Sequence, residues 1–143
     1  MVKYIAHRGN WDGPSPDNEN TKEYLYSAYF DKGFGVEVDI ILYNDELYYG
    51  HDEPQERVIT SFLLYPDVFC HAKDLNALGK LLDIGANCFW HQEDTVTLTS
   101  ENHIWCYPGH FPKHERAVWL NLHGATLPKD TTGIYGICGD KNE

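Results

Sequence analysis

The sequence lacks long hydrophobic runs and is poor in basic residues. Nowhere does it hold 18 consecutive apolar residues, and its start, MVKYIAHRG, has no apolar stretch long enough for a signal peptide. Lys and Arg number 11 against 22 Asp and Glu, which gives a formal net charge of −11. Nucleic acids and anionic membranes attract surfaces rich in Lys and Arg, so this balance argues against both as partners. We therefore expect a soluble, cytoplasmic protein without a nucleic-acid partner or membrane insertion. A single phosphate group held through a metal ion stays compatible with the charge.

Paired cysteines are also missing. The four cysteines, Cys70, Cys88, Cys106 and Cys138, form no C-x-x-C pair, which argues against a zinc ribbon. Each of them lies inside an apolar run, such as VFCHA or IWCYP. These surroundings predict buried free thiols rather than disulfides.

The chain does contain enough apolar material for one folded domain. Its 143 residues are 42% hydrophobic and 14% aromatic, so we expect a single domain over residues 1–143 with a substantial core. Segments 20–33 and 75–85 have the apolar spacing of helices. Strands are predicted at 2–6, 35–43, 46–52, 68–73, 87–92, 103–109, 117–122 and 134–140, with loops or short extended pieces at 95–102 and 123–133. This alternation favours a parallel sheet with crossover helices.

Polar side chains recur where the predicted strands end. In parallel sheets with crossover helices, the carboxyl ends of the strands carry the chemistry. The groups in question are His7 and Arg8, Glu37 and Asp39, His51 and Asp52, His71 and Lys73, His91 with Glu93 and Asp94, and finally Asp140. A lone histidine at a strand end is ordinarily a hydrogen-bonded structural residue, so no single histidine identifies a site.

Glu37 and Asp39 form the most informative pair. They lie two residues apart in VEVDI, so in a strand both carboxylates point to the same face. They could form the solvent face of a half-buried strand. If they face inward, they repel each other, and a cation is the simplest compensation. Carboxylate oxygens suit Mg²⁺ or Ca²⁺.

Five short motifs in order resemble the glycerophosphodiester phosphodiesterases, relatives of the phosphatidylinositol-specific phospholipases C. They are His7-Arg8-Gly9, Glu19-Asn20-Thr21, Glu37-Val38-Asp39, Asn44-Asp45 and His51-Asp52. Beyond residue 52 the match thins. There IWCYPG resembles the late Trp-containing strand of the family, and GICGD resembles its final strand. The Glu-x-Lys motif of the family's third strand corresponds here to His71-Ala72-Lys73, with His in place of a metal-binding Glu.

The resemblance implies a TIM-type (β/α) barrel of the α/β class. A full barrel needs about 200 to 250 residues, and this chain has 143. Because both the first and the last strands match, the shortening would be internal. We therefore expect an abbreviated or distorted barrel with about six to seven core strands and few helices in its later half.

The resemblance also implies a metal-dependent phosphodiester hydrolase acting on a small phosphodiester. His7 and His51 would be the general acid and base, in either order. Glu37 and Asp39 would hold the metal, and Arg8, Lys73 and Glu19 would serve the phosphate, Glu19 by orienting Arg8 or a metal-bound water. Gly9 would allow the sharp turn that brings the chain close to the ligand.

His71 leaves the identity of the metal open. With Glu37 and Asp39 alone, the site would bind Mg²⁺ or Ca²⁺ weakly, because affinity for these ions follows the charge of the ligands. With His71 as third ligand, Mn²⁺ or Zn²⁺ would be preferred. Two further alternatives are that Glu93 replaces the lost carboxylate and that His71 only forms a hydrogen bond.

Two other classes of function stay open on the sequence. The chain could be a non-catalytic relative that binds a phosphorylated or sugar-phosphate ligand. It could also be a small interaction protein whose 10 Tyr and 4 Trp mark a binding surface. A shortened barrel would leave strand edges or apolar patches that a homodimer could cover.

Overall fold

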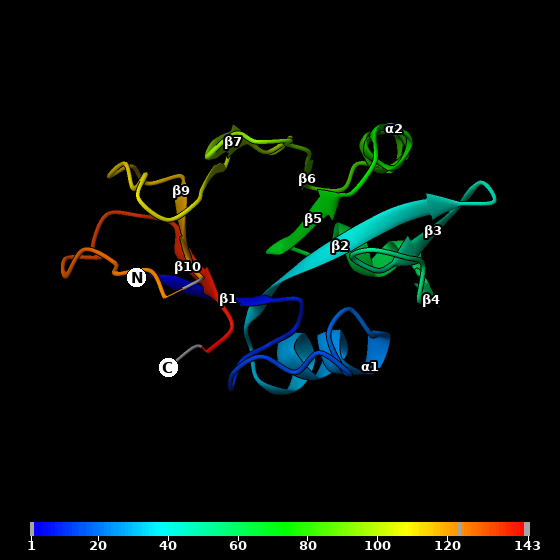
Figure 1. Cartoon of the computed structure of the whole chain (residues 1–143), viewed down its shortest axis with the longest axis horizontal. Helices are drawn as coiled ribbons and strands as arrows, with labels where there is room; N and C mark the ends of the chain where they lie inside the picture. Colours follow the sequence, from blue (N-terminus) through cyan, green and yellow to red (C-terminus); the bar gives the residue numbers. More distant parts are fainter. Residues whose placement is uncertain (1, 123, 142–143) are drawn as a thin grey trace.

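A computed structural model describes residues 2–122 and 124–141 (Figure 1). His123 of the predicted loop 123–133, like residues 1, 142 and 143 of the predicted domain, lies outside the described residues. The helical elements are α1 (Lys22–Tyr26), the π-helix η1 (Ser27–Asp31), the 3₁₀-helix η2 (Thr60–Leu64) and α2 (Leu75–Ile84). The strands are β1 (Lys3–His7), β2 (Gly35–Tyr43), β3 (Glu46–Tyr49), β4 (Glu56–Arg57), β5 (Val68–Ala72), β6 (Cys88–Phe89), β7 (Val96–Leu98), β8 (Ile104–Cys106), β9 (Ala117–Asn121) and β10 (Gly136–Gly139).

All ten strands belong to one strongly curled sheet (Figure 1). A parallel run follows the order β8-β9-β10-β1-β2-β5-β6, so the first and last strands of the chain are neighbours at its centre. Strands β3 and β4 continue antiparallel from the far end of β2, and β7 pairs antiparallel with β8. The carboxyl ends of the parallel strands therefore meet at one edge of the curl.

The expected TIM-type (β/α) barrel, even in abbreviated form, is wrong. The structure is a curled, strand-dominated open sheet, and its described residues form only two short α-helices. No described ladder joins β6 to β8, because β8 pairs with β9 on one side and with β7 on the other, and β6 is only two residues long. Side chains connect the β6 and β8 segments instead: the rings of Phe89 and Trp105 lie 4.8 Å apart, and His91 Nε2 is 2.6 Å from the Tyr107 hydroxyl.

The two predicted helices differ in how well the structure follows them. The segment 20–33 begins as α1, where the Thr21 hydroxyl accepts a hydrogen bond from Tyr24 N, but it continues as a π-helix from Ser27. In α2 the Asp74 carboxylate caps the first turn, and Gly85 ends the helix with a φ of +83°. Strong local capping signals at both ends thus explain why α2 agrees closely with its prediction.

The sheet separates two apolar layers. On its outer face, Val36, Val38 and Ile40 of β2 pack with α1, η2 and α2. On its inner face, Ile5, Phe69 and other side chains fill the base of the curl beneath the strand ends. The four cysteines are free and buried, as predicted. Among the described residues, none of the helices combines the length and the apolar character that a membrane crossing requires.

Several shorter elements depart from the sequence prediction. Strands β4 and β7 were not predicted as strands, and η2 was not predicted at all. The predicted strand 46–52 ends at Tyr49, because Gly50 has a φ of +156° and its backbone packs against Glu53, where an added Cβ would lie 2.0 Å from the carbonyl oxygen.

Two glycine substitutions test the pairing of β1 with β10. A Cβ at Gly136 would lie 2.7 Å from the Lys3 carbonyl oxygen, whereas one at Gly79, inside α2, would meet nothing within 4 Å. We expect Gly136→Ala to lower the free energy of unfolding by about 1–3 kcal/mol. Gly79→Ala should raise it by about 0.5–1 kcal/mol, because alanine favours the helix. Denaturant unfolding measures both, and a Gly136→Ala protein as stable as wild type would contradict this strand arrangement.

Candidate active site at the carboxyl ends of the parallel strands

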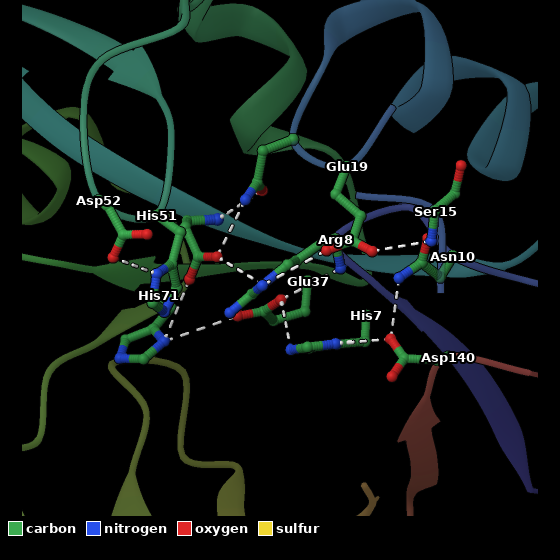
Figure 2. Close-up of polar contacts among 12 residues, drawn as sticks. His7, Arg8, Asn10, Ser15, Glu19, Glu37, His51, Asp52, His71 and Asp140 are labelled. Atoms are coloured by element: carbon green, nitrogen blue, oxygen red, sulfur yellow. Dashed lines mark hydrogen bonds and ion pairs between the residues drawn. The ribbon is translucent and has the colours of Figure 1, made fainter. Parts of the chain in front are cut away.

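A cavity of about 590 Å³ opens where the parallel strands end. This volume is within the usual range for small-molecule sites. All eight residues to which the sequence assigns a role line it: His7, Arg8, Glu19, Glu37, Asp39, His51, His71 and Lys73. Figure 2 shows most of these side chains turned toward one another around Glu37. The structure therefore brings the predicted residues together, whatever their roles.

Glu37 and Asp39 are buried on the inner face of β2, with 2% and 1% of their surface exposed. The strand register sets Glu37 beside His7 of β1 and Asp39 beside His71 of β5. Their intervening neighbour Val38 packs on the opposite, outer face. The pair does not form a solvent face, so its charge must be balanced inside the protein.

Asp39 has the densest set of partners. Its Oδ2 accepts a hydrogen bond of 3.0 Å from Asn20 Nδ2 and lies 3.0 Å from Arg8 Nε, and its backbone N donates to Asn20 Oδ1. Burial alone would raise the pKa of Asp39, but His71, Arg8 and Asn20 together hold it well below its usual range. Asp39 is therefore a carboxylate.

His71 faces both carboxylates. Its Nδ1 lies 3.3 Å from Asp39 Oδ1 and 3.6 Å from Glu37 Oε2. Its ring stacks on Phe89 and His91, with centroids 4.8 Å from each. Burial would lower the pKa of His71, but the hydrogen bonds and charges of the two carboxylates raise it above the ordinary value. The imidazole is thus held with one nitrogen turned toward the acidic pair.

These three residues have the arrangement of a cation site. One ligand atom from each of Glu37, Asp39 and His71 lies within 4.8 Å of the other two. Two carboxylates and an imidazole suit a divalent ion, and the imidazole favours Mn²⁺ or Zn²⁺ over Mg²⁺ and Ca²⁺. Glu93, the alternative third carboxylate, is exposed and is not among the described residues that line the cavity.

His7 is fixed by the last strand. Its Nδ1 lies 2.7 Å from Asp140 Oδ1, which also accepts a hydrogen bond of 2.9 Å from Asn10 Nδ2. Its Nε2 lies 3.9 Å from Glu37 Oε1 (Figure 2). Burial would lower the pKa of His7, but Asp140 and Glu37 outweigh it and raise the pKa. The carboxylate on Nδ1 leaves Nε2 as the nitrogen that can exchange a proton inside the cavity.

Arg8 occupies a tight turn and is held by two acids. Its φ of +56° and that of Gly9, +89°, are both left-handed, and a Cβ at Gly9 would lie 2.9 Å from the Tyr24 ring. Arg8 Nη1 is 3.4 Å from Glu19 Oε1, while Nε faces Asp39. The guanidinium therefore neutralises protein carboxylates, which leaves less of its charge for a phosphate than the sequence suggests.

His51 and Lys73 lie nearer the cavity mouth. The side chain of His51 is 39% exposed, and its Nδ1 is 2.8 Å from Asp52 Oδ1. Lys73 follows β5, and its backbone N donates to the Ile40 carbonyl. In Figure 2, His51 and His7 lie on either side of Glu37. The side chain of His7 is thus the less exposed of the two, at 16% against 39% for His51, and each histidine has a carboxylate on its Nδ1.

Among the residues of the cavity to which the sequence gave no role, three bring polar groups that are hydrogen-bonded there. Asp140 was noted only as a strand end, His91 only as a polar neighbour of Glu93, and Tyr107 was not noted. His91 and Tyr107 continue the inward alternation that starts at Phe89 and Trp105, and this period-two pattern is the signal that could have found them. Their contact joins β6 to β8 at the rim of the cavity.

No protein-family model, curated protein or solved structure matches this chain. The resemblance to the glycerophosphodiester phosphodiesterases therefore rests on the motifs of the sequence and on the arrangement of their residues.

Metal titration tests the Glu37–Asp39–His71 cluster. We expect Mn²⁺ to raise the melting temperature of the protein, because an ion that binds only the folded state stabilises it. His71→Ala should weaken Mn²⁺ binding by at least about tenfold, the effect that loss of a supporting partner at a metal site has. Glu93→Gln is the matched control and should change nothing. Equal Mn²⁺ affinity in wild type and His71→Ala would remove His71 from the ligand set.

Proposed function

We propose that this cavity is the active site of a metal-dependent phosphodiester hydrolase of the glycerophosphodiesterase type. The observation that carries the proposal is the buried Glu37–Asp39–His71 cluster in the same cavity as two histidines, each with a carboxylate on its Nδ1. A cation site supplies charge for a phosphate, and paired histidines supply proton transfer. Together these are the two requirements for cleaving a phosphodiester near neutral pH.

Ion binding and proton transfer would fall to different residues of the cavity. Glu37, Asp39 and His71 would hold the ion, which when bound supplies a Lewis acid for a non-bridging phosphate oxygen. Of His7 and His51, the neutral one accepts the proton of the attacking hydroxyl as the new P–O bond forms. The protonated one donates its proton to the leaving alkoxide as the old P–O bond breaks. Lys73 adds positive charge at the mouth.

Asp140 and Asp52 act on the histidines rather than on the substrate. A carboxylate on Nδ1 fixes the orientation of the ring, so that Nε2 is the nitrogen that exchanges a proton. Asp140 is half-buried and also bound by Asn10, whereas the side chain of Asp52 is 91% exposed. His7 is therefore the more rigidly oriented of the two.

A non-catalytic phosphate-ligand protein is the second candidate. The engagement of Arg8 by Asp39 and Glu19 favours it, because a guanidinium committed to two carboxylates adds little to transition-state stabilisation. Such a protein would use the cluster and Lys73 only to bind a phosphorylated or sugar-phosphate ligand.

We also propose a cytoplasmic location and leave room for a homodimer. Four free, buried thiols support a reducing compartment. Strands β4 and β7 end the paired sequence of strands, and a second chain could add there by edge pairing.

The test is turnover of a panel of glyceryl and inositol phosphodiesters by Mn²⁺- or Mg²⁺-loaded protein. We expect chelation to abolish activity, and His7→Ala and His51→Ala each to lower the rate at least ~100-fold, the size of a general acid–base contribution. His110→Ala, an exposed histidine outside the cavity, is the control and should keep full rate.

Two results would contradict the proposed hydrolase mechanism. Full activity in His51→Ala would contradict the proton-transfer roles. Saturable phosphate binding without turnover of any diester would favour the non-catalytic candidate.

A further inference from the structure

The walls of the cavity differ in chemistry from one part of the sheet to the other. On β1, β2 and β5, the inward residues near the strand ends are charged or titratable, as with His7, Glu37 and His71. On β8 and β9, the inward residues at the corresponding positions are not charged. The side of the cavity that β8 and β9 form is therefore uncharged.

The strand register shows where the change occurs. Leu120 of β9 pairs with Cys138 of β10. Leu122 and Asp140 follow two residues later in their respective segments. Asp140 holds His7, whereas Leu122 beside it belongs to the inner apolar cluster and lines the cavity. The charged lining thus stops between β10 and β9.

We call the uncharged part the apolar wall. It consists of Trp105, Tyr107, Leu120 and Leu122, and the loop after β1 adds Pro14 and Pro16 to the lining of the cavity. Trp105 and Leu120 are each 1% exposed and form its base, and Leu122 is 6% exposed. The two prolines are exposed at the rim.

Resting on the proposed function, we infer that the substrate is a phosphodiester in which one of the two alcohols is apolar, either aromatic or short aliphatic. The phosphate would lie at the Glu37–Asp39–His71 cluster, and the apolar alcohol would lie against the apolar wall. The other alcohol would point toward His51 and Lys73 at the mouth.

A polyol suits this wall poorly. The hydroxyl groups of a glyceryl or inositol group need hydrogen-bond partners when they leave water. The Tyr107 hydroxyl is engaged by His91, and the side chains of Leu120 and Leu122 offer no hydrogen-bond partner. An apolar alcohol loses nothing by leaving water there and gains the burial of its surface.

The experiment compares four phosphates on the Mn²⁺-loaded protein by isothermal titration calorimetry. They are inorganic phosphate, sn-glycerol 3-phosphate, the aromatic benzyl phosphate and the aliphatic n-butyl phosphate. We expect benzyl or n-butyl phosphate to bind at least about tenfold more tightly than glycerol 3-phosphate, since burying a side-chain-sized apolar group gives this much or more.

Leu122→Asn should lower benzyl phosphate affinity by about fivefold or more and leave inorganic phosphate affinity unchanged. Leu98→Asn makes the same substitution at a strand leucine that is 62% exposed and outside the cavity, and should change neither. Unchanged affinity for inorganic phosphate also shows that the Leu122→Asn protein is folded. The comparison of the phosphates on the wild-type protein does not depend on this variant.

The outcomes separate this inference from the proposed function. If the protein binds inorganic phosphate, and binds glycerol 3-phosphate as tightly as benzyl and n-butyl phosphate or more tightly, the inference of an apolar alcohol is wrong. The proposed hydrolase function is then unaffected. Failure of inorganic phosphate to bind the Mn²⁺-loaded protein would overturn both.

Discussion

Two carboxylates buried side by side on one strand are the constraint around which the rest of the site is arranged. Glu37 and Asp39 are almost fully removed from water, and without compensation such charges would cost several kcal/mol each. The left-handed turn at Arg8 brings one cation to Asp39, and Asn20, at a φ of +59°, brings an amide. His71 Nδ1 supplies a further partner to both carboxylates. The positions of Arg8, Asn20 and His71 therefore depend on contacts with the two carboxylates.

The strands with strong apolar alternation could be predicted from the sequence, whereas closure of the sheet could not. The segment 35–43 is apolar throughout its outer face and coincides with β2. By contrast, the contacts that bridge β6 and β8 join Phe89 to Trp105 and His91 to Tyr107 across a gap that no local pattern encodes. The barrel expectation already allowed for few helices in the later half, and it failed because the sheet does not close: β6 pairs only with β5 among the described residues.

The candidate site shows the same division between local and long-range information. The period of two in VEVDI placed Glu37 and Asp39 on one face, and the motif order placed His7 and His51 near them. The partner of His7 lies 133 residues away, so the Asp140 contact depends on the adjacency of the first and last strands. Glu19 was expected to orient Arg8, and the two side chains are in contact. The ion pair of Arg8 with Asp39 was not expected, and only the packed structure reveals it.

The most direct measurement is anomalous diffraction from crystals of the protein soaked in Mn²⁺. The account predicts one strong anomalous peak in the cavity, within coordination distance of carboxylate oxygens of Glu37 and Asp39 and of a His71 ring nitrogen. The peak should vanish in Glu37→Gln crystals soaked in the same way. An empty cluster at saturating Mn²⁺, or a peak bound only elsewhere on the acidic surface, would contradict the central claim that these three residues form a metal site.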